Sequence, residues 1–139
     1  MNIRQRQKYK RLGKPCIKDV RDLDYQLGRN ILPLLVRFKQ MKRNGYPGEF
    51  YKEGQDEAIA INKWESILDA MIWSFNELVN SEPNYPIKHD FGNSYVDDKG
   101  YWHSGYEWTE EEHKVVKDYY NKKQHGFELF GKYYSSLWD

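Results

Sequence analysis

Residues 62–80 read Asn62-Lys63-Trp64-Glu65-Ser66-Ile67-Leu68-Asp69-Ala70-Met71-Ile72-Trp73-Ser74-Phe75-Asn76-Glu77-Leu78-Val79-Asn80, and they hold the clearest helical pattern of the chain. The large apolar residues recur at steps of four, three, four and three: Trp64, Leu68, Met71, Phe75 and Leu78. This spacing predicts a helix that buries one face. Asn62 and Glu65 fit a capping box at its start, although the run that follows Asp56 also allows an earlier beginning.

The preceding segment predicts another helix, over residues 22–43. Its apolar residues share the three-and-four spacing: Leu23, Leu27, Ile31, Leu34, Leu35, Phe38 and Met41. Asp22 suits the N-cap position. Pro33 removes a backbone hydrogen bond, so we expect a kink near residues 28–32 or two short helices. Asn44-Gly45 then predicts the helix stop, and Tyr46-Pro47-Gly48-Glu49 predicts a type II turn.

The segment from Thr109 to the C-terminus predicts the third helix. Thr109 and Glu112 form a second capping-box pattern. Gly126 either divides this helix or lets another helix approach closely. We expect the final Leu137 and Trp138 to be buried, because apolar ends that are not packed fray. The predicted inner face holds Val116, Tyr120, Phe127, Phe130, Tyr134 and Leu137.

A long segment, residues 81–108, separates the second and third predicted helices and is rich in Gly, Asn, Asp and aromatic residues. Within it, residues 95–102 predict a small hairpin, because two short β-prone runs flank a turn that ends in Gly100. The predicted fold class is mainly α, a three-helix core with a small β-hairpin insert between the second and third helices. We divide the chain into a basic N-terminal arm, residues 1–18, and a single helical domain, residues 19–139, with the insert at 81–108. The arm shows neither helical nor strand periodicity.

The composition limits the class of protein. The 139 residues can bury a core without cross-links. Cys16 is the single cysteine, so the chain forms no internal disulfide, and no apolar run reaches the roughly 20 residues that a membrane span requires. We therefore expect a cytoplasmic protein with no membrane partner.

Four blocks of the chain form a recognisable pattern: Ile31-Leu32-Pro33-Leu34-Leu35-Val36-Arg37-Phe38-Lys39, Asn44-Gly45-Tyr46-Pro47-Gly48, Trp64-Glu65-Ser66-Ile67-Leu68-Asp69-Ala70-Met71-Ile72-Trp73-Ser74-Phe75, and Gly126-Phe127-Glu128-Leu129-Phe130 through Leu137-Trp138-Asp139. Together they resemble a group of small proteins of tailed bacteriophages that has no established activity. The resemblance covers about half of the chain and rests on hydrophobic and turn residues. It implies a viral origin, a helical fold and a location in the cytoplasm of the infected host cell, and it carries over no catalytic residue.

The sequence offers no strong pattern for catalysis or metal binding. Glu110 and His113 have the Glu-x-x-His spacing of di-iron bundles, but those bundles need a second such pair, which the chain lacks. Glu65 and Asp69, one helical turn apart, could share a proton, although a solvated helix face explains them better. We therefore predict no catalytic residue, no metal ligand and no cofactor, with an enzyme as the less favoured alternative. The residues considered for a metal site are His89, His103, His113, His125, Asp90, Asp97, Asp98 and Glu110.

The arm is the first candidate binding surface. Of the 22 basic residues, seven lie within residues 1–18, which leaves 15 basic against 21 acidic residues, a net charge of −6, in the rest of the chain. Basic side chains with an interleaved ring can neutralise phosphates and stack on a base. A solubility or docking segment is the alternative. The candidate nucleic-acid-binding residues are Arg4, Arg6, Lys8, Tyr9, Lys10, Arg11 and Lys14.

The insert is the second candidate surface, because aromatic rings supply rigid contact area in protein interfaces. The alternative is that its rings face inward and cover an open side of the helices. The candidate partner-binding residues are Tyr85, Tyr95, Tyr101, Trp102, Tyr106 and Trp108.

These surfaces lead us to expect a non-enzymatic phage accessory protein that binds a host or phage macromolecule, of the host-takeover or counter-defence type. The alternatives are an RNA- or DNA-binding protein that uses the basic arm, and a binder of a small nucleotide-like ligand.

Overall fold

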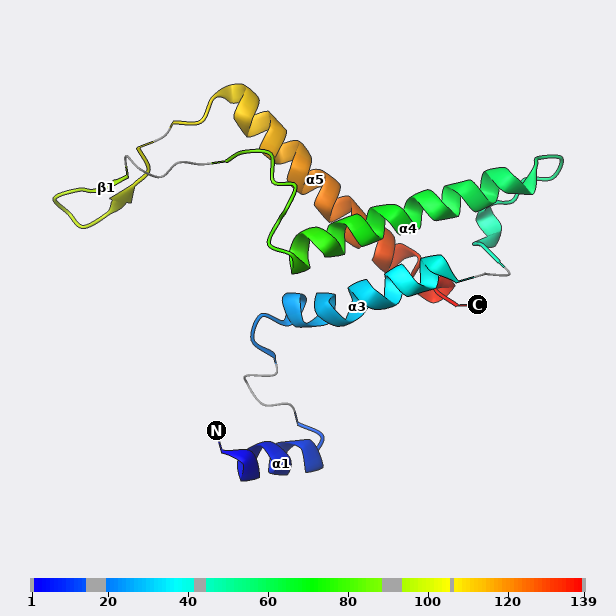
Figure 1. The fold of residues 1–139 in the computed structure, drawn as a ribbon, viewed down its shortest axis with the longest axis horizontal. Coiled ribbons are helices and arrows are strands. Elements are labelled where there is room, and N and C mark those ends of the chain that lie inside the picture. Colours follow the sequence, from blue (N-terminus) through cyan, green and yellow to red (C-terminus); the bar gives the residue numbers. More distant parts are fainter. Residues whose placement is uncertain (1, 15–19, 42–44, 89–93, 106, 139) are drawn as a thin grey trace.

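The computed structural model describes residues 2–14, 20–41, 45–88, 94–105 and 107–138. Within these ranges the chain forms four α-helices: α1 (Ile3–Arg11), α3 (Leu23–Gln40), α4 (Glu57–Val79) and α5 (Glu110–Lys132) (Figure 1). A 3-10 turn, η1 (Gly48–Phe50), precedes α4, and a second, η2 (Tyr134–Ser136), follows α5. One antiparallel hairpin pairs β1 (Tyr95–Val96) with β2 (Trp102–His103).

The predicted fold class is confirmed in part. The chain is mainly α and carries a two-stranded hairpin before its last helix. The expected number of three helices is wrong, because α1 adds a fourth helix in the part of the chain that the structure describes. The hairpin accordingly lies between the third and fourth described α-helices, α4 and α5.

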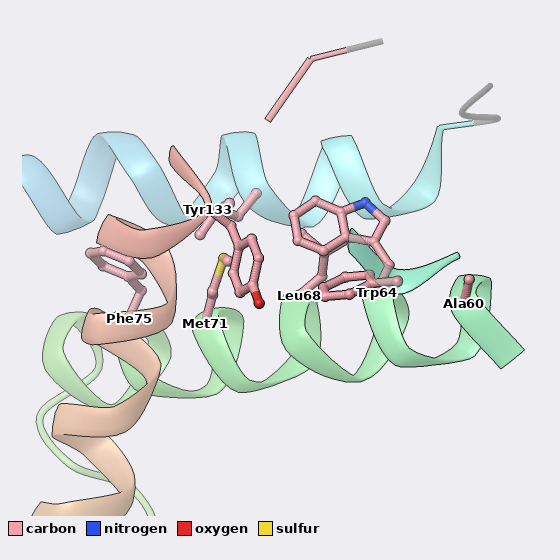
Figure 2. Close-up of a cluster of buried hydrophobic side chains, with 8 residues drawn as sticks. Ala60, Trp64, Leu68, Met71, Phe75 and Tyr133 are labelled. Carbon is pink, nitrogen blue, oxygen red and sulfur yellow. The ribbon is translucent and has the colours of Figure 1, made fainter. Parts of the chain in front are cut away.

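The central helix is α4, which packs against both α3 and α5. Figure 2 shows the buried side chains of α4 lined up along one face, with Tyr133 reaching them from the end of α5. This is the face that the spacing of residues 64–78 predicts. Each large apolar side chain among them contributes roughly 1.5–3 kcal/mol when it leaves water. The buried core residues are Leu35, Phe50, Ala60, Trp64, Leu68, Met71, Phe75 and Tyr133.

The earlier of the two expected starts of α4 is correct. The Asp56 side chain accepts a hydrogen bond from the Ala58 backbone N–H, and the helix begins at Glu57. The capping box predicted at Asn62 and Glu65 is wrong, because Asn62 lies inside the helix. Ala60 is buried and extends the apolar face by one turn beyond Trp64. Burial on this extra turn outweighs the local capping preference of Asn62.

The α3 helix runs through Pro33 as one element, so the alternative of two short helices is wrong. Burial of Gly28 and Leu35 on either side of Pro33 offsets the single backbone hydrogen bond that proline lacks. Asp22 does occupy the N-cap position, but its side chain makes no capping hydrogen bond, and its backbone is left-handed with φ 49°.

The predicted type II turn at residues 46–49 is also wrong. Such a turn needs a left-handed third residue, whereas Gly48 has no positive φ and instead begins η1. The Phe50 backbone N–H donates to the Pro47 carbonyl, and the Phe50 ring is buried against Trp64 and Tyr133. Burial of this ring favours the tighter turn. Asn44, the first residue of the predicted stop Asn44-Gly45, lies outside the described residues.

The α5 helix starts as predicted, with the Thr109 hydroxyl accepting from the Glu112 backbone N–H. Gly126 does not divide it. A Cβ atom at Gly126 would overlap the Ser74 side chain and lie 2.5 Å from the Ala70 carbonyl oxygen. The glycine is therefore the point of close approach between α4 and α5, which is the second of the two expectations for it.

The predicted inner face of α5 is shifted by one residue in two places. Tyr119 and Tyr133 are buried, whereas Tyr120 and Tyr134 are exposed. The reason is Gly126, which is itself buried and belongs to the face. With Gly126 included, the buried positions around it follow steps of seven, Tyr119 to Gly126 to Tyr133. At the C-terminus Leu137 packs against the core, but Trp138 is exposed, so the expected burial of Trp138 is wrong.

The N-terminal segment is helical over Ile3–Arg11, which corrects the expectation that it lacks helical character. Asn2 and Gln5 form a reciprocal capping box, in which each side chain accepts from the other residue's backbone N–H. Arg, Lys and Gln are good helix formers, which favours a helix in this segment. None of the described α1 residues is buried, and Figure 1 shows α1 apart from α3.

Candidate binding site

The hairpin at residues 95–103 is ordered by its own turn. Tyr95 pairs with His103 and Val96 with Trp102. The Asp97 carboxylate oxygen Oδ1 accepts from the backbone N–H groups of Lys99 and Tyr101, each at 2.9 Å. Gly100 takes the left-handed conformation, φ 83°, that closes the turn. The turn geometry is therefore fixed by side-chain and backbone bonds rather than by packing on the helices.

A second set of contacts ties the two strands together. His103 Nε2 lies 2.7 Å from the other Asp97 oxygen, Oδ2, and the His103 ring stacks on Tyr95 with centroids 5.0 Å apart and an interplanar angle of 16°. The hydrogen bond from His103 and those from the Tyr101 and Lys99 backbone hold the pKa of the Asp97 carboxyl below its ordinary value. The carboxylate form is thus the one that this hairpin favours.

The rings of the hairpin point to solvent. Tyr95, Tyr101 and Trp102 are 57%, 67% and 58% exposed. Figure 1 shows the hairpin standing away from the helices. The alternative that these three rings cover an open side of the helices is therefore wrong. The three rings are therefore exposed to solvent on a small, ordered hairpin.

The other ring candidates of the insert lie differently. Tyr85 is half-buried, and its ring contacts those of Tyr119 and Tyr120 on α5. Burial raises the pKa of the Tyr85 hydroxyl, with Tyr120 and Glu82 adding to the effect. Trp108 is half-buried beside His113. Tyr106 lies outside the described residues. The insert therefore divides into packed rings near the helices and exposed rings on the hairpin.

A buried carboxylate anchors the start of the insert, and nothing in the sequence pattern had singled it out. Glu77 on α4 is fully buried. One oxygen accepts from the Asn84 backbone N–H at 2.9 Å and from the Tyr119 hydroxyl at 3.2 Å, and the other from the Asn84 side-chain amide at 3.2 Å. Burial and the neighbouring Glu77 and Glu82 carboxylates raise the pKa of Tyr119. We call Glu77, Asn84 and Tyr119 the insert anchor.

The anchor holds a strained reversal of the chain. Ser81 and Glu82 are left-handed, with φ 60° and 55°. The Glu82 backbone N–H donates to the Glu77 carbonyl, and the Glu82 side chain accepts from Lys123 on α5 at 2.9 Å. One sequence feature could have indicated that Glu77 is buried. Ala70, Ser74 and Glu77 are small or polar residues at helical spacing, and they face α5. The anchor fixes where the insert leaves α4.

The basic candidates lie on or just after α1. Arg4, Arg6, Lys8, Tyr9, Lys10 and Arg11 belong to the helix, and Lys14 follows it. All are exposed, and α1 contains no acidic residue. Arg4, Lys8 and Arg11, at helical spacing, line one shared concave surface. The helix thus presents fixed positive charge where the sequence predicted a segment without regular structure.

The remaining chemical candidates are the possible metal ligands and the carboxylate pair Glu65 and Asp69. No group of three metal-ligating side chains gathers there. His89 and Asp90 lie outside the described ranges. Glu65 and Asp69 both approach Lys39 of α3, at 3.8 and 2.6 Å, so their carboxylates face an ammonium group rather than sharing a proton. Among the described helices none is long and apolar enough to cross a bilayer.

The arrangement defines a helical scaffold that carries an aromatic hairpin and a separate basic helix. Comparison of the chain with protein-family models, with curated proteins and with solved structures finds no match in any of the three. The case for function therefore rests on the surfaces themselves.

Proposed function

We propose that this chain is a non-enzymatic phage accessory protein that binds a host or phage protein through its hairpin, in the cytoplasm of the infected cell. The observation that carries the proposal is the exposure of Tyr95, Tyr101 and Trp102 on a turn held by Asp97. Tyr and Trp dominate the energetics of protein interfaces because they bury large area at low entropic cost. A preformed turn lowers that cost further.

The hairpin suits a protein partner better than a small ligand. Its exposed rings lie on a protruding element, whereas small-molecule sites are concave and bury most of the ligand. The stack of Tyr95 on His103 also leaves that pair less able to open around an inserted ring. A protein surface that receives the protruding rings is the complementary shape.

The test is capture of partners from infected-cell lysate by the tagged protein, after nuclease treatment, with Tyr101→Ala/Trp102→Ala beside the unaltered chain. We expect the double variant to lose the captured protein, because removing two such rings costs roughly 2–4 kcal/mol of binding energy. Tyr51→Ala is the matched control, since Tyr51 is also an exposed ring but lies beside η1. Equal capture by all three proteins would exclude the hairpin as the binding surface.

A second candidate, RNA or DNA binding, is favoured by one specific observation: α1 is a preformed helix with basic residues and no acid. Such a helix can follow a phosphate backbone, and the bound counterions that it displaces make the affinity depend on salt. The net negative charge of residues 19–139 opposes this binding, which is why we rank it second.

Salt dependence separates the two candidates. If α1 binds nucleic acid, Lys8→Gln/Arg11→Gln should weaken binding to a labelled oligonucleotide and reduce the slope of log K against log salt by about 2. The control is Lys114→Gln/Lys117→Gln, which removes the same charge at the same spacing from exposed positions on α5. A flat salt response of the unaltered protein would exclude this candidate.

A further inference from the structure

The α3 helix carries an apolar stripe on a face that the bundle leaves uncovered. Leu23, Leu27 and Leu34 are exposed, and Leu34 is 70% exposed. Beside Leu34 runs a groove of about 440 Å³ between α3 and the end of α5, whose far side includes Tyr134, itself 68% exposed. The core of the bundle is complete without these residues.

The exposed area of this stripe can be compared with the area that an interface needs. Soluble monomers rarely expose contiguous apolar surface of more than a few hundred Å². If all of the exposed surface of Leu23, Leu27, Leu34 and Tyr134 is covered, roughly 500 Å² per chain, two copies bury about 1,000 Å², the lower limit for a biological interface.

The spacing of the stripe indicates what covers it. Leu27 precedes the midpoint between Asn30 and Ile31 by the same number of residues as Leu34 follows it. Two α3 helices that cross antiparallel at this midpoint therefore place Leu27 of each copy opposite Leu34 of the other. A two-fold interface is self-complementary in this way, because residue i meets residue j and j meets i.

The α1 helix of the same chain is a poorer occupant. Of its exposed apolar residues, Tyr9 and the C-cap residue Leu12 share one face, and Ile3 lies on another. One face of α1 therefore offers only two apolar side chains to the stripe, and the rest of the helix is basic with no acid. Arg37, which lines the groove, would add repulsion.

We propose that two copies of this chain associate through α3, antiparallel about a two-fold axis near residues 30 and 31. Sedimentation equilibrium should show a concentration-dependent dimer. Leu27→Asp/Leu34→Asp should raise the dimer dissociation constant by roughly 100-fold or more, because it places charges at the centre of the interface. Ile59→Asp/Val115→Asp, at exposed apolar positions of α4 and α5, should leave the dimer unchanged.

Disulfide trapping tests the orientation, in a Cys16→Ser background. We expect a Leu27→Cys chain mixed with a Leu34→Cys chain to form a mixed disulfide, whereas neither variant alone cross-links efficiently. Efficient cross-linking of each variant with itself would overturn the antiparallel arrangement. A monomer at all concentrations, or a dimer that Leu27→Asp/Leu34→Asp leaves intact while circular dichroism shows a folded chain, would overturn the proposal.

Discussion

Gly126 sets the separation of α4 and α5. Gly126→Ala places a methyl group against the Ser74 side chain and the Ala70 carbonyl, and backbone cannot move aside cheaply. We expect this variant to lose roughly 1–3 kcal/mol of unfolding free energy in urea denaturation. Gly131→Ala is the control, because its methyl group would meet nothing within 4 Å and alanine favours the helix. Equal stability of the two variants would show that the helices do not depend on this contact.

Glu77 is the second decisive residue, since its carboxylate satisfies three donors in a fully buried place. Glu77→Ala leaves those donors without this acceptor, and we expect a loss of at least 1–3 kcal/mol. Tyr119→Phe removes only one of the donors and should cost about 0.5–1.5 kcal/mol.

Urea denaturation measures both effects, with hydrogen exchange at the Asn84 amide as a local probe. Glu128→Ala, at an exposed position of α5, is the control and should change stability by less than about 0.5 kcal/mol. The anchor would lose its assigned role if Glu77→Ala behaved like Glu128→Ala.

Among the elements, the hairpin should respond to acid. Because the folded hairpin lowers the pKa of Asp97 from its ordinary value of 3.8, the contribution of this carboxylate is complete above that value and is lost as the pH falls through the lowered pKa. We expect His103→Ala to move the Asp97 pKa back toward 3.8, since the His103 hydrogen bond is the largest cause of the shift. NMR titration of the Asp97 carboxyl carbon measures this, and an unchanged pKa in the variant would contradict the observed pairing.

The elements also show what sequence patterns can predict. The face of α4 was predictable because Trp64, Leu68, Met71 and Phe75 follow one uninterrupted spacing. The face of α5 was predicted at Phe127, Phe130 and Leu137 but missed at Tyr119 and Tyr133, because Gly126 has no side chain and does not contribute to an apolar pattern although the close contact depends on it. The hairpin was found from its turn residues.

Other elements depend on interactions that spacing does not record. The α1 helix was missed because it buries no face and so shows no apolar spacing; its sequence signals are the capping box of Asn2 and Gln5 and its helix-forming residues. For the rings on the hairpin the sequence left exposure and inward packing open, and the structure shows exposure. Glu77 was not predicted, since only the folded chain brings Tyr119 and Asn84, far apart in sequence, to the same carboxylate.

At the scale of the whole molecule, the core and the proposed binding surface lie in different parts of the chain. The buried core lies in α3, η1, α4 and the end of α5, and the hairpin contributes none of its residues. A chain that lacks the hairpin should therefore fold with nearly unchanged helicity and thermal midpoint, because the hairpin rings are not part of the core.

The most direct test of the proposed function replaces residues 94–104 by a short Gly-Ser linker and measures partner capture from nuclease-treated infected-cell lysate beside the unaltered chain. We predict that the replaced chain unfolds at nearly the same temperature and captures no partner. A chain that remains folded and captures the same protein as strongly as before would contradict the assignment of the hairpin as the binding site.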